Sequence, residues 1–90
     1  MIAPILIPII RRAILDLVED TGGELNDEMI TILLNELGHR VARGDVLGEI
    51  RWCVDEGLLI GSLVEPYYVA RATQAGRDVA NGVLRHDGVS

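Results

Sequence analysis

The chain contains no phenylalanine, no lysine and only one cysteine in 90 residues. A single thiol, Cys53, cannot form a disulfide within the chain, which fits a reducing compartment. One tryptophan and two tyrosines are the only aromatic residues, so a core must be built mainly from isoleucine, leucine, valine and alanine. This length and composition predict one domain with one modest core.

Positive charge is also scarce. The 14 acidic residues outnumber the 8 basic ones, all of them arginine, and the net charge is −6. A chain with this balance is repelled by nucleic-acid phosphates at long range, although a local strip of arginines can still attract them. The composition therefore argues against non-specific DNA binding but leaves a specific contact open.

Signatures of catalysis, metal binding and membrane insertion are missing as well. There is no phosphate-binding loop, no dinucleotide fingerprint and no nucleophile beside a base. His39 and His86 have no partners at metal-ligand spacing. The apolar start MIAPILIPII is shorter than the ~20 residues that cross a bilayer, and it lacks the basic leader of a signal peptide. We therefore predict a cytoplasmic protein that is not an enzyme and needs no cofactor or metal.

Apolar spacing predicts three helices in the first two thirds of the chain. Pro8 suits the first turn of a helix over 9–20, Asn26 is expected to cap a second over 27–37, and Gly57 is expected to end a third after the link 39–43. Leu15 fits no apolar stripe. The residues expected to face inward are Ile9, Ile10, Ala13, Ile14, Leu17, Val18, Met29, Ile30, Leu33, Leu34, Leu37, Val46, Leu47, Ile50, Cys53 and Val54.

A hairpin and a fourth helix follow. The runs 58–64 and 67–72 are rich in apolar, β-branched and aromatic residues and flank Glu65-Pro66, which predicts a small β-hairpin. Thr73 is expected to cap a helix that begins at Gln74, and the last residues, 83–90, are expected to form a tail. Cys53 lies on the apolar face of its helix, which predicts a buried and inert thiol.

This order of elements resembles a winged helix-turn-helix domain, as in MarR-, PadR- and ArsR-type regulators. Val54-Asp55-Glu56-Gly57-Leu58-Leu59 resembles the glycine-leucine ending of their recognition helix. The stretch 72–80, ATQAGRDVA, resembles the Leu-Thr-x-x-Gly-x-x-x-Ala that opens their helix after the wing, with Ala72 in place of leucine. We therefore expect a mainly α fold with a small β-hairpin over 9–82, preceded by an apolar arm, 1–8.

The stretch IRWCVDEGLL, the short wing and ATQAGRDVANG together are also similar to small winged-helix proteins of Mu-like phages and prophages. Together the two resemblances imply a homodimeric transcription regulator, or a DNA-associated accessory factor, that binds double-stranded DNA, and the second implies a phage or prophage origin. The alternative is a winged helix that serves as a protein-protein interaction module without DNA binding.

In such a domain the third helix enters the major groove. The resemblance thus implies these candidate DNA contacts: Arg40, Arg43, Gly48, Glu49, Arg51, Trp52 and Arg71. Arg40 and Arg43 have an alternative role in solvating the turn or pairing with Glu36 and Asp45. Three acids on the same helix, Glu49, Asp55 and Glu56, oppose an approach to phosphate.

Trp52 lies on the polar side of its helix and has three possible roles. It folds back against the wing or the arm, it anchors a partner protein, or it contacts DNA. The arm is more apolar than a solvated segment requires, which predicts a dimer contact or a cover over the domain's own core. The candidate dimer or partner contacts are Ile2, Ile5, Leu6, Ile7 and Trp52.

Overall fold

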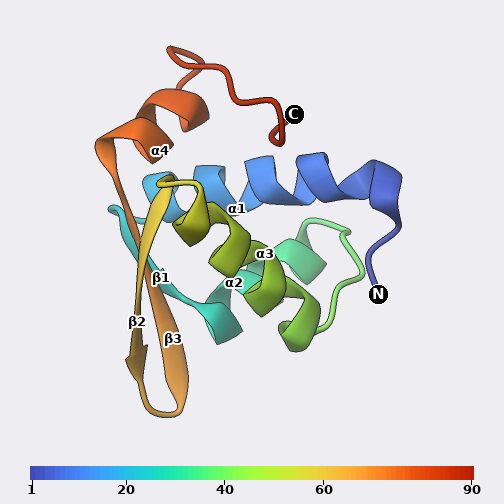
Figure 1. Ribbon diagram of the computed structural model, residues 1–90. Coiled ribbons are helices and arrows are strands. Elements are labelled where there is room, and N and C mark those ends of the chain that lie inside the picture. Colours follow the sequence, from blue (N-terminus) through green and yellow to red (C-terminus); the bar gives the residue numbers. More distant parts are fainter.

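The computed structural model describes all 90 residues as a helical cluster with a three-stranded antiparallel sheet at one side (Figure 1). The elements are η1 (Pro4–Leu6), α1 (Ile7–Asp20), β1 (Glu24–Asn26), α2 (Asp27–Glu36), α3 (Arg43–Asp55), β2 (Leu59–Val64), β3 (Tyr67–Ala72) and α4 (Gln74–Ala80). This is the predicted winged-helix arrangement, with one strand more than the predicted hairpin. No helix has both the length and the apolar character needed to cross a membrane.

Helix α1 runs between α4 on one side and the α2–α3 pair on the other (Figure 1). Pro8 lies in its first turn, as predicted, and Ile10, Ile14 and Val18 are buried. Because α1 is covered from more than one direction, its buried surface is wider than one stripe. Leu15 is therefore buried although it fits no stripe, and Ile9, predicted to face inward, is 42% exposed.

Helix α2 begins with the predicted cap, in which the Asn26 side chain accepts a hydrogen bond of 2.8 Å from the Met29 amide. Ile30 and Leu34 are buried, but the prediction that Met29 and Leu37 face inward is wrong. Both lie at the ends of the helix, where neighbouring elements no longer cover it. Helix α4 ends at Ala80, and the chain turns at Gly82 with a φ of +76°.

The sheet has the order β1-β3-β2, and both neighbouring pairs are antiparallel. Strands β2 and β3 form the predicted wing, which projects away from the helices (Figure 1). Strand β1 was not predicted, since three residues carry no alternation signal. It forms because β3 offers it an edge, with Leu25 opposite Ala70.

The residues after α4 do not form a loose tail. Residues 83–90, here called the C-terminal segment, run back over α1, and the Ser90 amide donates a hydrogen bond of 3.1 Å to the Pro8 carbonyl. Figure 1 shows this segment crossing above α1. The two ends of the chain therefore flank the first half of α1.

Candidate nucleic-acid interface

Helix α3 turns one face into the core and another to solvent. Val46, Ile50 and Cys53 are fully buried, as predicted. The opposite face is exposed at Gly44, Gly48, Arg51 and Asp55, which we call the outward face of α3. The helix contacts α2, β2 and α1. The outward face is thus the part of α3 that is open to a partner.

The two glycines leave the backbone of this face uncovered. A Cβ added to Gly44 or to Gly48 would meet no atom within 4 Å, and neither residue has a positive φ. The fold therefore needs glycine at neither position, although each glycine costs a helix about 1 kcal/mol relative to alanine. Uncovered helix backbone lets a large partner approach closely. Gly44 was missed in the sequence, although its spacing of four from Gly48 places both on one face.

The arginines divide into paired and unpaired groups. Five of the 8 form salt bridges with carboxylates, namely Arg11–Glu49, Arg12–Asp16, Arg43–Asp27, Arg71–Glu24 and Arg77–Glu19. Arg40, Arg51 and Arg85 have no carboxylate partner. Arg51 lies on the outward face of α3, with its guanidinium carbon 5.5 Å from the centroid of the Tyr68 ring. It is the one arginine of α3 whose charge is not already neutralised.

Arg43 is largely committed to the fold. Its Nε donates to the Asp27 carboxylate at 2.8 Å, and its Nη2 donates to the Pro66 carbonyl at 2.8 Å. The partner is thus Asp27, and neither Glu36 nor Asp45. The Arg43 side chain is still 42% exposed, so one edge of the guanidinium remains open to solvent.

Asp27 is the buried centre of this junction. It also accepts a hydrogen bond of 3.0 Å from the Tyr68 amide, so one carboxylate ties α2 to α3 and to the wing. Burial by itself would raise the pKa of Asp27, but the hydrogen bonds from Arg43 and Tyr68 and the charge of Arg43 outweigh it and lower the pKa. The sequence marked Asp27 only as an acid in a first helical turn.

The start of α3 has no capping side chain. The residue before it is Ala42, whose side chain cannot accept a hydrogen bond from the helix amides, whereas Asn26 caps α2 and Thr73 caps α4. The first amides of α3 are therefore free to bind an anion such as a phosphate. Arg40 is exposed in the link that leads to this end of the helix.

Trp52 folds back onto its own domain, on the flank of α3 that faces α1. The Arg11 guanidinium carbon lies 3.6 Å from the centroid of its ring, and the His86 ring meets it edge-on at 5.2 Å. A Cβ added to Gly88 would collide with the indole. Of the three predicted roles the structure has the first, with different partners: Arg11 and the C-terminal segment take the place of the wing and the arm.

Glu49 lies on the same flank as Trp52. Its carboxylate accepts a hydrogen bond of 2.7 Å from the Arg11 Nε, and both side chains are more than four fifths buried. The structure thus brings Glu49 and Trp52 together with Arg11 and separates them from the outward face, where Gly48 and Arg51 lie.

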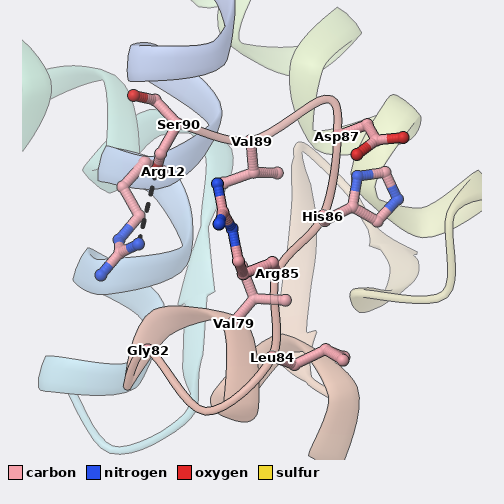
Figure 2. A pocket seen from close by; sticks show the side chains of 9 residues that line it. All are labelled: Arg12, Val79, Gly82, Leu84, Arg85, His86, Asp87, Val89 and Ser90. Atoms are coloured by element: carbon pink, nitrogen blue, oxygen red, sulfur yellow. Dashed lines mark hydrogen bonds between the residues drawn. The ribbon is translucent and has the colours of Figure 1, made fainter.

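A cavity of about 390 Å³ lies beneath the C-terminal segment (Figure 2). Arg12, on its wall, donates hydrogen bonds to the Ala80 and Ser90 carbonyls and pairs with Asp16, so its charge serves the fold. Figure 2 shows the Arg85 side chain lying along the segment between Leu84 and Val89. Arg85 remains exposed and unpaired, far in sequence from α3.

The arm divides into buried and exposed parts. Ile2 is only 9% exposed and belongs to the core, so its prediction as a dimer contact is wrong: the arm covers its own domain there. The amino group of Met1 pairs with Asp45 at 3.1 Å, which holds the arm against α3. Ile5 is 83% exposed and Leu6 44%, whereas Ile7 is half-buried.

Cys53 is the buried thiol that the sequence predicts, and burial raises its pKa to about 12. No cluster of three histidine, cysteine or acidic side chains is arranged to hold a metal ion. The residues that stand out for function are therefore Arg51 and the two glycines of the outward face of α3, Gly44 and Gly48.

The uncharacterized protein gp26 of Escherichia phage Mu is 35% identical to this chain over 79 residues, which cover 88% of this chain and 82% of gp26. The chain belongs to the family of this phage Mu protein. The resemblance to small proteins of Mu-like phages is thereby confirmed. No model of a known protein family matches the chain.

Two solved structures share the fold. F93 from STIV, described as a winged-helix DNA-binding protein, superposes with a TM-score of 0.71 at 17% identity over 83% of each chain. Bacillus subtilis PadR, solved in complex with operator DNA, superposes with a TM-score of 0.66 at 22% identity over 91% of this chain and 50% of PadR. The predicted winged-helix fold is confirmed by both.

Proposed function

We propose that this protein binds double-stranded DNA through the outward face of α3 and acts as a phage or prophage regulator or DNA-associated accessory factor. One observation carries the proposal: α3 exposes uncovered backbone at Gly44 and Gly48 beside Arg51, which has no carboxylate partner. The fold supports it, because a PadR with the same architecture was solved with operator DNA.

We propose distinct tasks for the groups on this face. The major groove is about 12 Å wide and admits a helix, and the two glycines let α3 enter it deeply. Arg51 then reaches a base edge or a phosphate, while the uncapped amides at the start of α3 and Arg40 bind the sugar-phosphate backbone. Arg43 and Arg71 contribute less, since each already holds a carboxylate. We do not assign DNA contacts to Glu49 or Trp52.

The net charge of −6 limits the affinity for arbitrary DNA. Repulsion between the acidic protein and the phosphates must be offset by a few close contacts, so binding should be weak on a generic duplex and should fall steeply with salt. A DNA target places the action of the protein in the bacterial cytoplasm.

A homodimer fits this function. Ile5 and Leu6 are exposed near the start of α1, and Ile9 on the next turn is exposed too. Two copies that meet along this surface by a two-fold axis would present two α3 helices to a palindromic site.

The decisive experiment compares Arg51→Ala with Arg85→Ala on a fluorescein-labelled duplex, read by anisotropy at about 50 mM salt. Both variants lose one unpaired, exposed arginine, so they change the net charge equally. We expect Arg51→Ala to weaken binding about tenfold and Arg85→Ala to leave it within about twofold, because only Arg51 lies on the outward face.

Equal losses in the two variants would mean that binding follows net charge alone and does not use α3. Absence of binding by the unaltered protein, on both a generic duplex and a pool of random duplexes, would reject DNA as the target.

A second function, contact with another protein, is favoured by the wing. Strand β2, LIGSLV, has no charged residue, and its exposed side chains are apolar at Ile60, Leu63 and Val64. A surface of this kind suits a protein partner better than phosphate.

A further inference from the structure

A groove of about 340 Å³ lies between the outward face of α3 and the wing. Leu47 and Arg51 line it on the side of the helix, and Leu63 and Tyr68 line it on the side of the wing. Leu63 and Tyr68 are cross-strand partners, so their side chains lie on the same face of the wing, the one that is turned towards α3. The groove therefore continues the outward face of α3 onto the wing.

The groove carries positive charge although the protein is acidic. Its charged residues are two arginines, Arg43 and Arg51, and one acid, Asp27, which gives +1, whereas the whole chain has a net charge of −6. Asp27 is buried and paired with Arg43, so solvent meets only guanidinium groups: the open edge of Arg43 and the exposed Arg51. A groove of this kind attracts an anion.

Tyr68 lies over Gly61 of the neighbouring strand. A Cβ added to Gly61 would collide with the ring and the hydroxyl of Tyr68, although Gly61 has no positive φ. Glycine is therefore required at this position to make room for the tyrosine and not to permit an unusual backbone. Outside the sheet, the one hydrogen bond of Tyr68 is made by its backbone amide. Its hydroxyl is thus unpartnered, and it is open to solvent.

Arg51 lies beside this ring. Its guanidinium carbon is 5.5 Å from the centroid of the Tyr68 ring, a looser contact than the 3.6 Å between Arg11 and Trp52. Arg51 also has no carboxylate partner, so its N–H groups are free to turn to a ligand. Two unpartnered donors, a guanidinium and a phenol, therefore line the same groove.

We propose that this groove holds the sugar-phosphate backbone of one DNA strand, with a phosphate bound between the Arg51 guanidinium and the Tyr68 hydroxyl. Both groups donate to phosphate oxygens, and an arginine can do so with two parallel N–H groups. Leu47 and Leu63 offer the deoxyribose an apolar surface. Gly61 serves the same site, because it makes room for Tyr68.

This assignment rests on the proposed function and narrows it. It gives Arg51 a phosphate as its ligand and not a base edge. A phosphate contact positions the protein on the duplex and carries no sequence information directly. Arg51 and Tyr68 should therefore contribute equally on every duplex, whatever its sequence.

The test is Tyr68→Phe, which removes the hydroxyl and keeps the ring over Gly61. Tyr67→Phe is the matched control, because it removes the same group from the neighbouring residue, which does not line the groove. Binding is read by anisotropy on four fluorescein-labelled duplexes of unrelated sequence, each at several salt concentrations. Far-UV circular dichroism and thermal melting verify that both variants are folded.

We expect Tyr68→Phe to weaken binding about fivefold, by the same factor on all four duplexes, and Tyr67→Phe to leave it within about 1.5-fold. The salt dependence should not change in Tyr68→Phe, since a phenol carries no charge. Arg51→Ala should reduce the slope of the logarithm of affinity against the logarithm of salt by about one, as the loss of one phosphate contact requires.

A second variant tests the role of Gly61. Gly61→Ala places a methyl group where the Tyr68 hydroxyl lies, so the ring must move away. We expect Gly61→Ala to bind DNA at least as weakly as Tyr68→Phe. Adding Tyr68→Phe to Gly61→Ala should cause no further loss, because the hydroxyl no longer reaches the phosphate.

Unchanged binding in Tyr68→Phe, or equal losses in Tyr68→Phe and Tyr67→Phe, would overturn the assignment. If Arg51→Ala were still impaired, the proposed function would stand. Losses in Tyr68→Phe that differ more than about threefold among the four duplexes would also overturn it, because the ligand would then be a base. Absence of binding by the parent protein on every duplex would reject the proposed function, and the phosphate site with it.

Discussion

At the scale of single residues, Asp27 has the largest consequences for the fold. It is the one charged residue that is buried, with 3% exposure, and it holds Arg43 from α3 and the Tyr68 amide from β3. The orientation of the wing relative to α3 therefore depends on a single carboxylate. Arg43, predicted as a DNA contact, is chiefly the counter-ion of this group.

Replacing Asp27 with Asn should lower the free energy of unfolding by about 2 kcal/mol at pH 7, because the amide keeps the shape but loses the charge-assisted hydrogen bonds. Urea denaturation followed by circular dichroism measures this loss. Glu28→Gln, the neighbouring acid in the same helical turn, is the control, and we expect it to change stability by less than about 0.5 kcal/mol.

The difference in the free energy of unfolding between the parent protein and Asp27→Asn should also depend on pH. The pKa of Asp27 is lower in the folded protein than its ordinary value, so its stabilisation is present above about pH 4 and is lost as pH falls through the folded pKa. The difference between the parent and Asp27→Asn should therefore shrink towards pH 2. A difference that stays constant with pH would show that the charge of Asp27 does not stabilise the fold.

At the scale of elements, the C-terminal segment acts as a cover for α1 and α3. Arg11 donates a hydrogen bond of 3.2 Å to the Gly88 carbonyl while its guanidinium stacks on Trp52. His86 and Glu56 meet at 3.0 Å, which joins the segment to the end of α3. Trp52 is thus enclosed by residues from both ends of the sequence.

Gly88→Val should displace the C-terminal segment, because any side chain at this position collides with the indole. We expect the emission of Trp52, the only tryptophan, to shift to longer wavelength and acrylamide to quench it about twofold more strongly. Gly82→Ala is unsuitable as a control, since φ is +76° there, whereas Gly48→Ala has free space and should leave the emission unchanged. Unchanged quenching in Gly88→Val would mean that the segment does not cover Trp52 in solution.

At the scale of the whole molecule, the open question is how copies of an acidic protein associate. The exposed apolar residues lie in several separate places: at the arm and α1, on and just after α2, on the wing, and in the C-terminal segment. Two self-complementary contacts on one protomer would link copies into an open chain, whereas one alone would give a closed dimer.

Ile5→Lys tests the contact at the arm. Ile5 is 83% exposed, so the substitution leaves the core intact while it places two like charges in the proposed dimer interface. Sedimentation velocity at high micromolar concentration should show a dimer for the parent and mainly monomer for Ile5→Lys. We expect the dimer dissociation constant of the variant to be at least tenfold higher than that of the parent. Leu37→Lys should sediment like the parent. A parent that sediments as a single 9.8 kDa species would exclude the dimer at the arm.

Periodicity in the sequence was sufficient to predict the helices, the wing and most of the core. The apolar spacing around Ile14 and Ile50 and the caps at Asn26 and Thr73 are local signals, and each acts within a few residues. Strand β1 left no such signal, because its pairing with β3 joins residues more than forty positions apart.

The orientation of side chains near the surface was decided by tertiary structure alone. The sequence placed Trp52 and Glu49 on a polar face but did not show that Arg11 and the C-terminal segment would cover that face. In the same way, the sequence indicated only that Asp27 is a favourable charge at the start of a helix. Its burial depends on α3 and the wing, which pack over it in the folded protein. An apolar stripe on a helix depends on the angle between successive residues, so it can be predicted from the spacing of residues in the sequence. Which polar flank becomes covered depends on contacts between distant segments, and the spacing of residues holds no information about those contacts.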